Sequence, residues 1–469
     1  MNLDWREGVK SASYIGLLLT ASLLFLTLGS DDYDQLRLRM GVGGVVSALF
    51  LLAVRGNIRK LFTGNPASLF LFYFSGYIVL RAAWALLSQL FPRFSHGADS
   101  LLVYQYVQSA VRWVYASLLF LTGYYLLRSR LRTSGWLWAS AGCGLFLALN
   151  ALPPLFSKGY ADYTRGELEP SFFYPALYFH PWIRRFFLGS YAHPNYAGDV
   201  IAFGIFSALG IFLYSLFSLS PDRGRLAGDH LKRSERLIAL GMPLCMVGAT
   251  SLAVFLIFSR GTILSFVFSL VVFLTVALWK FPSRKQFVFS FLALVSILGF
   301  LVWSGKSAAL WKELSTVQRE FDAEKEGSLS ANREGARRAL AILREYPVWG
   351  VGTGGYRLVS KNFASPGTEG SMASKTVYCH YLETLAEEGV GGLLYFLFIG
   401  AYFIEVSRGL KNAKSRFQFI AGLSLFAPVL MVFLHASFGL LMQRISLSTL
   451  VYIWMGASLG VLSKDYRAS

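Results

Sequence analysis

Long apolar stretches separated by short polar segments run through the whole chain. An α-helix rises about 1.5 Å per residue, so about 20 apolar residues cross a hydrocarbon core of ~30 Å. The pattern predicts about twelve transmembrane helices, near residues 11–29, 39–54, 67–90, 103–127, 135–157, 194–217, 237–258, 262–280, 287–304, 389–407, 418–436 and 446–463. We therefore expect an all-α polytopic membrane protein whose residues 1–469 form a single membrane domain.

Composition supports this interpretation, and the distribution of charge predicts the orientation of the helices across the membrane. Hydrophobic residues make up 55% of the chain and charged residues only 15%, which excludes an ordinary soluble fold. The net charge of +18 comes from Lys and Arg in alternate loops, as in segments 55–60, 128–132, 223–236, 280–285 and 408–416. The positive-inside rule assigns such loops to the cytoplasm. Both termini are then cytoplasmic, the first span is retained, and a nucleic-acid partner is disfavoured.

The remaining loops include two long segments on the opposite, extracytoplasmic side. The medium loop covers residues 158–193, and the large loop covers residues 305–388. Residues 308–346 of the large loop are typical of a helix that stops at Pro347, where a glycine-rich turn begins. Long loops in compact proteins are more often functional than spacers, so we expect the working surface on this side.

Charged residues within the spans indicate where that surface lies. Arg81, Arg112, Asp199, Arg260 and His435 all fall in the outer halves or ends of their predicted spans. Because charge in hydrocarbon is costly, such residues favour a functional cavity that opens outward. The alternative is structural: Arg81 or Arg112 pairs with Asp199, or extends its charged end to the membrane interface.

Several arginines are candidates for binding an anion. Arg260 lies in a tight Ser-Arg-Gly reversal between two spans, and Arg184 and Arg185 precede a span that begins at Pro194. A guanidinium binds phosphate through two parallel hydrogen bonds, and a helix N-terminus favours negative charge. The alternatives are an anchor to lipid headgroups for Arg260 and simple helix initiation at Pro194.

The large loop carries further candidates. Its arginines at 333, 337 and 344 share one helical face, which is either a glycan contact or a solvated basic surface. The glycine-rich segment 350–355 lacks the βαβ context of a nucleotide-binding loop, so we interpret it as a turn. His380 opens a helix and is a candidate general base. Glu383 and Glu387 are one turn apart, and the alternative interpretation for them is a solvated pair. No metal site or cofactor is predicted.

The order of these elements resembles the bacterial O-antigen ligase and polysaccharide polymerase superfamily. The resemblance covers roughly residues 180–400 and rests on motifs that are weak singly but fairly specific in order and spacing. They are Arg185 before His193-Pro194-Asn195, Ser259-Arg260-Gly261, Arg333 and Arg337 before Pro347-x-x-Gly350-x-Gly352, and Tyr381-Leu382-Glu383 before Glu387-x-Gly389-x-x-Gly392.

The resemblance implies a metal-independent glycosyltransferase in the bacterial cytoplasmic (inner) membrane, with its active site facing the periplasm or exterior. Its donor would be a glycan on undecaprenyl diphosphate, held by Arg184 or Arg185 and by Arg260. A residue near 378–380, either Tyr378 or His380, would assist deprotonation of the acceptor hydroxyl. Its partners would be an acceptor glycan or lipid A core, membrane lipids and a chain-length regulator. Further candidate glycan or acceptor contacts are His193, Asn195, Arg333, Arg337, Arg344, Arg81 and Arg112.

One departure bears on the reaction. Many family members, the ligases especially, carry His-Asn where Tyr378-Cys379 stands, and His380 comes two residues later. Either His380 takes that role or the base is absent, which favours polymerisation of repeat units over ligation to lipid A core or a protein. A flippase or exporter of lipid-linked sugars is the non-enzymatic alternative. It predicts a polar path through the full membrane depth, whereas the polar residues here lie outward.

Overall fold

The structure is a computed structural model that describes residues 12–17, 65–90, 100–155, 194–218, 233–256, 260–281, 328–366, 377, 379–437 and 445–466. Within these ranges every regular element is helical. The long helices are α4 (Pro66–Leu90), α5 (Ser100–Leu126), α6 (Arg130–Leu155), α9 (Pro194–Ser218), α10 (Arg233–Leu256), α11 (Arg260–Lys280), α17 (Val390–Lys411), α18 (Arg416–His435) and α19 (Ile445–Leu462). The large loop contributes α14 (Ser328–Glu345), α15 (Tyr356–Val359), the 3-10 helix η6 (Ser360–Phe363) and α16 (His380–Glu388).

The described helices coincide with the predicted spans. Five stretches are long and apolar enough to cross a bilayer: Pro66–Leu87, Gly198–Ser218, Gly261–Lys280, Val390–Lys411 and Arg416–His435. Helices α5, α6, α10 and α19 match four further predicted spans. An all-helical, multi-pass membrane protein is thus confirmed, whereas the number twelve and the side of the termini stay predictions. Spans 39–54 and 287–304, most of 11–29 and the medium loop 158–193 lie outside the described residues.

Helices α9 and α18 form the centre of the bundle. In their apolar stretches 83% and 89% of residues are buried, against 33% in α4 and in α17, whose outer faces are free to contact lipid. The backbones of α6 and α9 approach closely, because a Cβ at Gly204 would lie 2.5 Å from the Cα of Gly144. Small residues permit such contact, which supplies packing energy where lipid is as apolar as the protein.

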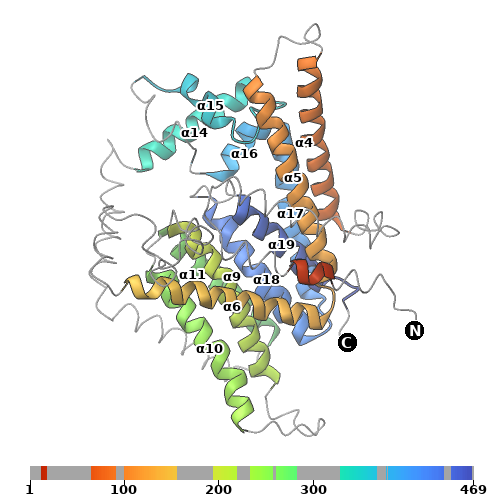
Figure 1. The fold of residues 1–469 in the computed structure, drawn as a ribbon, viewed down its shortest axis with the longest axis vertical. Coiled ribbons are helices and arrows are strands. Elements are labelled where there is room, and N and C mark those ends of the chain that lie inside the picture. Colours follow the sequence, from red (N-terminus) through yellow and green to blue (C-terminus); the bar gives the residue numbers. More distant parts are fainter. Residues whose placement is uncertain are drawn as a thin grey trace.

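The helices of the large loop gather at one end of the molecule, beside the end of α4 and the start of α5 (Figure 1). Helix α14 ends at Glu345, two residues before Pro347, as predicted, because the residue before a proline is disfavoured in helical conformation. Its apolar face packs against the glycine-rich segment and α16 in a small separate core, formed by Ala339, Ile342, Val351, Tyr356, Val377 and Ala386.

Candidate functional site

The glycine-rich segment after α14 is a turn that locks against the corner between α16 and α17. Gly350, Gly352, Gly354 and Gly389 all have positive φ angles, a conformation that only glycine adopts readily. The Gly352 amide donates to the Glu387 carbonyl at 2.8 Å, and the Val390 amide donates to the Pro347 carbonyl at 2.9 Å. Two motifs separated in the sequence therefore form one rigid unit, and the prediction of a turn is confirmed.

Helix α4 holds this unit from the side through Arg81. The buried guanidinium donates from Nη1 to the carbonyls of Trp349 at 2.9 Å and Glu387 at 3.1 Å. It also forms an ion pair with Glu388 at 2.7 Å, with side-chain exposures of 1% and 2%. Nearby, the Tyr77 hydroxyl donates to the Glu388 carbonyl at 2.9 Å. Arg81 thus satisfies loop carbonyls that the irregular backbone would otherwise leave unpaired.

The proposed pairing of Arg81 with Asp199 is wrong. Glu388 is the partner of Arg81, while Asp199 accepts hydrogen bonds from His435 Nδ1 at 2.8 and 3.0 Å. Both Asp199 and His435 are fully buried. The charges at these helix ends therefore form at least two separate pairs, Arg81 with Glu388 and Asp199 with His435.

Glu387 connects the turn to the following short helix. One of its carboxyl oxygens accepts from the amides of Gly354 at 2.7 Å and Tyr356 at 3.3 Å. Burial, together with the neighbouring carboxylates of Glu383 and Glu388, raises the pKa of Glu387 well above its usual range, and the two amide donors offset part of that shift. The interpretation of Glu383 and Glu387 as a solvated pair is wrong, because both side chains are buried.

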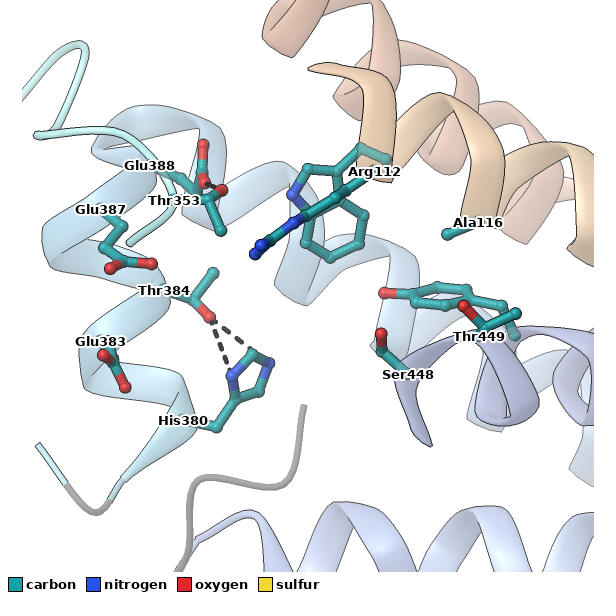
Figure 2. Close-up of a pocket in the computed structure, with 12 residues that line it drawn as sticks. Arg112, Ala116, Thr353, His380, Glu383, Thr384, Glu387, Glu388, Ser448 and Thr449 are labelled. Carbon is teal, nitrogen blue, oxygen red and sulfur yellow. Dashed lines mark hydrogen bonds between the residues drawn. The ribbon is translucent and has the colours of Figure 1, made fainter. Parts of the chain in front are cut away.

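A small cavity of about 50 Å³ lies between α5, α16 and α19, lined by both apolar and polar side chains. Figure 2 shows the Arg112 guanidinium pointing from α5 toward Thr353 and Thr384, with His380 below them and Ser448 and Thr449 opposite. Its lining combines a cation, carboxyl groups, hydroxyl groups and an imidazole. Such a lining suits a sugar hydroxyl or water molecules, which need several polar partners in a buried site.

His380 lines this cavity and is held on three sides. Its backbone amide donates to the Ala436 carbonyl at 3.0 Å, its Nε2 lies 3.2 Å from the Tyr395 hydroxyl, and the Thr384 hydroxyl lies 3.4 Å from Nδ1. Burial lowers the pKa of His380 to about 4. The imidazole is therefore neutral at neutral pH.

We expect His380 to remain neutral on mild acidification. In the protein with isotope-labelled histidine, the imidazole resonance missing from a His380→Gln variant should keep its chemical shift from pH 8 to pH 5.5. An ordinary histidine titrates near pH 6.5, about the middle of that range. A change of shift centred near pH 6.5 would show that His380 is solvated and that the cavity is open to bulk water.

The last turn of α18 contacts the starts of both α16 and α11. The Ala436 carbonyl accepts from His380 and the Phe433 carbonyl accepts from the Tyr381 hydroxyl at 2.6 Å, so α16 begins on the end of α18. The neighbouring His435 contacts the first turn of α11, whose first residue is Arg260. The structure thus brings the start of the His380 helix and the start of the Arg260 helix to the same end of α18.

Other predicted site residues have different outcomes. Arg333, Arg337 and Arg344 share an exposed face of α14, outside the cavity lining. Arg337 pairs with Glu334 at 2.8 Å. Arg112 lines the cavity, and Arg81 contacts it indirectly, through a hydrogen bond to the carbonyl of the lining residue Glu387. Arg260 and Asn195 lie in the first turns of α11 and α9, and their side chains are outside the described part of the structure. Arg184, Arg185, His193 and Tyr378 lie outside the described residues.

Sequence reasoning missed Thr353, Thr384 and Glu388 as site residues. Thr353 lies in the predicted turn, and its hydroxyl donates to the Glu388 carboxylate. The signal available was the local polarity of segment 383–388, which holds three glutamates on a helix that leads directly into an apolar span. Carboxylates at such a junction are solvated unless another segment covers them, and the covering segment is far away in the sequence.

The geometry can now be compared with known proteins. Residues 245–397 match the family model described as O-antigen ligase. The match begins in α10 and ends in α17, so it includes the start of α11, the glycine turn and the His380 helix. It confirms the resemblance to the O-antigen ligase and polymerase superfamily, and it supports an enzyme of glycan transfer in surface polysaccharide biosynthesis. A comparison with curated proteins found no match.

Proposed function

We propose that this protein transfers a glycan from undecaprenyl diphosphate to an acceptor hydroxyl at the outer face of the cytoplasmic membrane, and that it polymerises surface polysaccharide repeat units. The O-antigen ligase family match carries this proposal, because it spans the elements that converge on the end of α18. The polar cavity beside His380 supports it, since its size and lining suit a hydroxyl group.

The reaction breaks the bond between the anomeric carbon and the phosphate oxygen and forms a bond from that carbon to the acceptor oxygen. The diphosphate leaves as an anion on its lipid, and the acceptor proton passes to a base. Arginines that hold the diphosphate more tightly as its charge develops lower the barrier. In this proposal Arg260 and Arg184 or Arg185 hold the diphosphate, and neutral His380 receives the proton.

Ligation of a finished glycan to lipid A core or a protein is the alternative, and the description of the matching family favours it. The reacting groups are the same and only the acceptor differs. The tyrosine and cysteine at 378 and 379, in place of the His-Asn pair of many ligases, favour polymerisation. The two products are distinguishable on a gel.

A strain that lacks the gene, complemented with variants of it, tests both the proposed function and the proposed role of the arginines in binding the diphosphate. We expect Arg260→Ala and Arg185→Ala to fail to restore surface glycan, because one lost transition-state donor costs about 10²–10³ in rate. Arg408→Ala is the control, since Arg408 is exposed and pairs only with Glu405 within the described residues. The measurement is gel separation of the surface glycan in each strain.

The pattern of the gel separates the outcomes. Loss of a polymerase leaves core bearing a single repeat unit, whereas loss of a ligase leaves bare core while lipid-linked polymer accumulates. Normal glycan in both arginine variants contradicts the arginine clamp. Normal glycan in the deletion strain itself contradicts the proposed function.

A further inference from the structure

The buried Asp199–His435 pair lies among three helix ends, away from the cavity beside His380. Asp199 is in the second turn of α9, and His435 is the last residue of α18. Their exposures are 0% and 1%, and His435 Nδ1 donates to the two oxygens of Asp199 at 2.8 and 3.0 Å. Burying a polar pair this deeply carries a desolvation cost, and in some proteins such a pair is retained because it fixes a specific arrangement.

The element that the pair fixes is the start of α11. A Cβ at Gly261 would lie 2.5 Å from His435 Nε2, so the imidazole rests directly on the backbone one residue after Arg260. Thr262 follows, with its hydroxyl 3.5 Å from His435 Nδ1. The first turn of α9 closes the other side, because a Cβ at Gly198 would lie 2.5 Å from Thr262 Cγ2. Only glycine at 198 and 261 permits these contacts.

The same end of α18 carries the His380 helix. The Ala436 carbonyl, one residue after His435, accepts from the His380 amide at 3.0 Å. The orientation of the His435 ring therefore sets where α11 begins relative to the start of α16. Asp199 determines that orientation, since it accepts from Nδ1 and leaves Nε2 toward Gly261.

We propose that Asp199 and His435 are positioning residues that hold Arg260 in place for the diphosphate of the lipid-linked donor. This inference rests on the proposed function, in which Arg260 binds that diphosphate. Neither side chain contacts the donor in this proposal. Because a misplacement of about 1 Å that originates far from the reacting atoms can cost about 10²-fold in rate, the pair would affect how Arg260 meets the donor without forming part of the binding surface.

The test measures binding of undecaprenyl diphosphate to the full-length protein in nanodiscs, beside its melting temperature. We expect Asp199→Asn and His435→Phe to raise Kd by about 10-fold, which corresponds to a loss of about 1.4 kcal/mol of binding free energy. His435→Asn should bind nearly as well as the wild type, because its side-chain amide restores a donor near the position of Nδ1. Tyr402→Phe is the matched control: it removes a buried inter-helix hydrogen bond of 2.9 Å to Ser458, between α17 and α19.

The outcomes distinguish this inference from the proposed function. If Arg260→Ala loses binding while Asp199→Asn and His435→Phe bind as the wild type does, the positioning role is overturned and the proposed function stands. If the wild type does not bind undecaprenyl diphosphate, or Arg260→Ala binds equally well, the proposed function fails and the inference with it. Equal losses in Tyr402→Phe would show a general effect of destabilisation and overturn the positioning role.

If Asp199→Asn and His435→Phe do not fold, the variant Gly261→Ala tests the positioning role instead. Gly261→Ala keeps the hydrogen bonds between Asp199 and His435 and places a methyl group against His435 Nε2, whose ring is held by Asp199. We expect weaker binding of undecaprenyl diphosphate by this variant. Gly248→Ala in α10 is its control, because no atom lies within 4 Å of the added methyl group. Unchanged binding in Gly261→Ala would overturn the inference.

Discussion

Replacement of Gly389 by alanine is expected to disrupt the glycine turn and abolish surface glycan synthesis. Gly389 has φ of 54° and ψ of −131°, a conformation that costs an L-residue about 1–3 kcal/mol. The added Cβ would lie 2.5 Å from the Val348 carbonyl oxygen and 2.7 Å from that of Pro347. Both are backbone atoms, so the clash can be relieved only by moving the main chain of the turn. Overpacking of this kind adds about 1–3 kcal/mol. The combined cost of about 2–6 kcal/mol should appear as a lower melting temperature and a loss of glycan in a complemented deletion strain.

The control for this substitution lies in the same helical hairpin. Gly400, in the middle of α17, has no neighbour within 4 Å of an added Cβ. Gly400→Ala should keep or slightly raise the melting temperature, because alanine has a higher helix propensity than glycine by about 1 kcal/mol. Equal melting temperatures for Gly389→Ala and Gly400→Ala would contradict the packing of the turn against the α16–α17 corner.

The membrane helices were predictable from the sequence because their signal is local. A stretch of about 20 apolar residues has few alternatives to a transmembrane helix, and α4, α9, α17 and α18 begin and end close to their predicted bounds. The stop of α14 was predictable for the same reason, since Pro347 acts on the residues next to it. These inferences need no knowledge of which helices touch.

The pairing of charges was not predictable, because it depends on contacts between distant segments. Arg81 and Glu388 are 307 positions apart by their numbers (388 − 81), and no local pattern in α4 indicates that the large loop folds onto it. Asp199 was therefore paired with the wrong charge, since the sequence alone ranks Asp199 and Glu388 equally as partners for Arg81. His435 lies at the end of its helix, as predicted, but its contact with Gly261 appears only when α18 packs on α11.

Burial of the glutamates was missed for a related reason. A helix with Glu383, Glu387 and Glu388 has the composition of a solvated helix, yet all three side chains are buried, with the glycine turn covering Glu387 and Arg81 pairing with Glu388. The glycines carried a usable signal. A turn that needs positive φ at Gly350, Gly352 and Gly354 exposes successive amides, and a buried carboxylate such as Glu387 satisfies one of them.

Removal of Arg81 alone is expected to destabilise the protein strongly, because it leaves the Glu388 carboxylate buried without its cation. Breaking a buried ion pair by removing one partner costs about 3–5 kcal/mol. Arg81→Met keeps much of the side-chain volume, so the lost charge and hydrogen bonds dominate the effect. The double variant Arg81→Met/Glu388→Gln removes both charges and keeps an oxygen that accepts from Thr353. It should therefore be more stable than Arg81→Met, even though the carbonyls of Trp349 and Glu387 still lose a donor.

Unfolding in denaturant of the wild type, both single variants and the double variant measures this coupling directly. If the two residues interact as the structure shows, the cost of the double variant is smaller than the sum of the single costs by about 0.5–3 kcal/mol, the range for contacting pairs. Arg408→Met provides the exposed comparison, because its ion pair with Glu405 is solvated and such pairs contribute about 0.2–1 kcal/mol. Additive single costs would mean that Arg81 and Glu388 do not touch. The large loop would then be held against α4 by the hydrogen bonds of Arg81 to the carbonyls of Trp349 and Glu387 and by those of the Tyr77 hydroxyl.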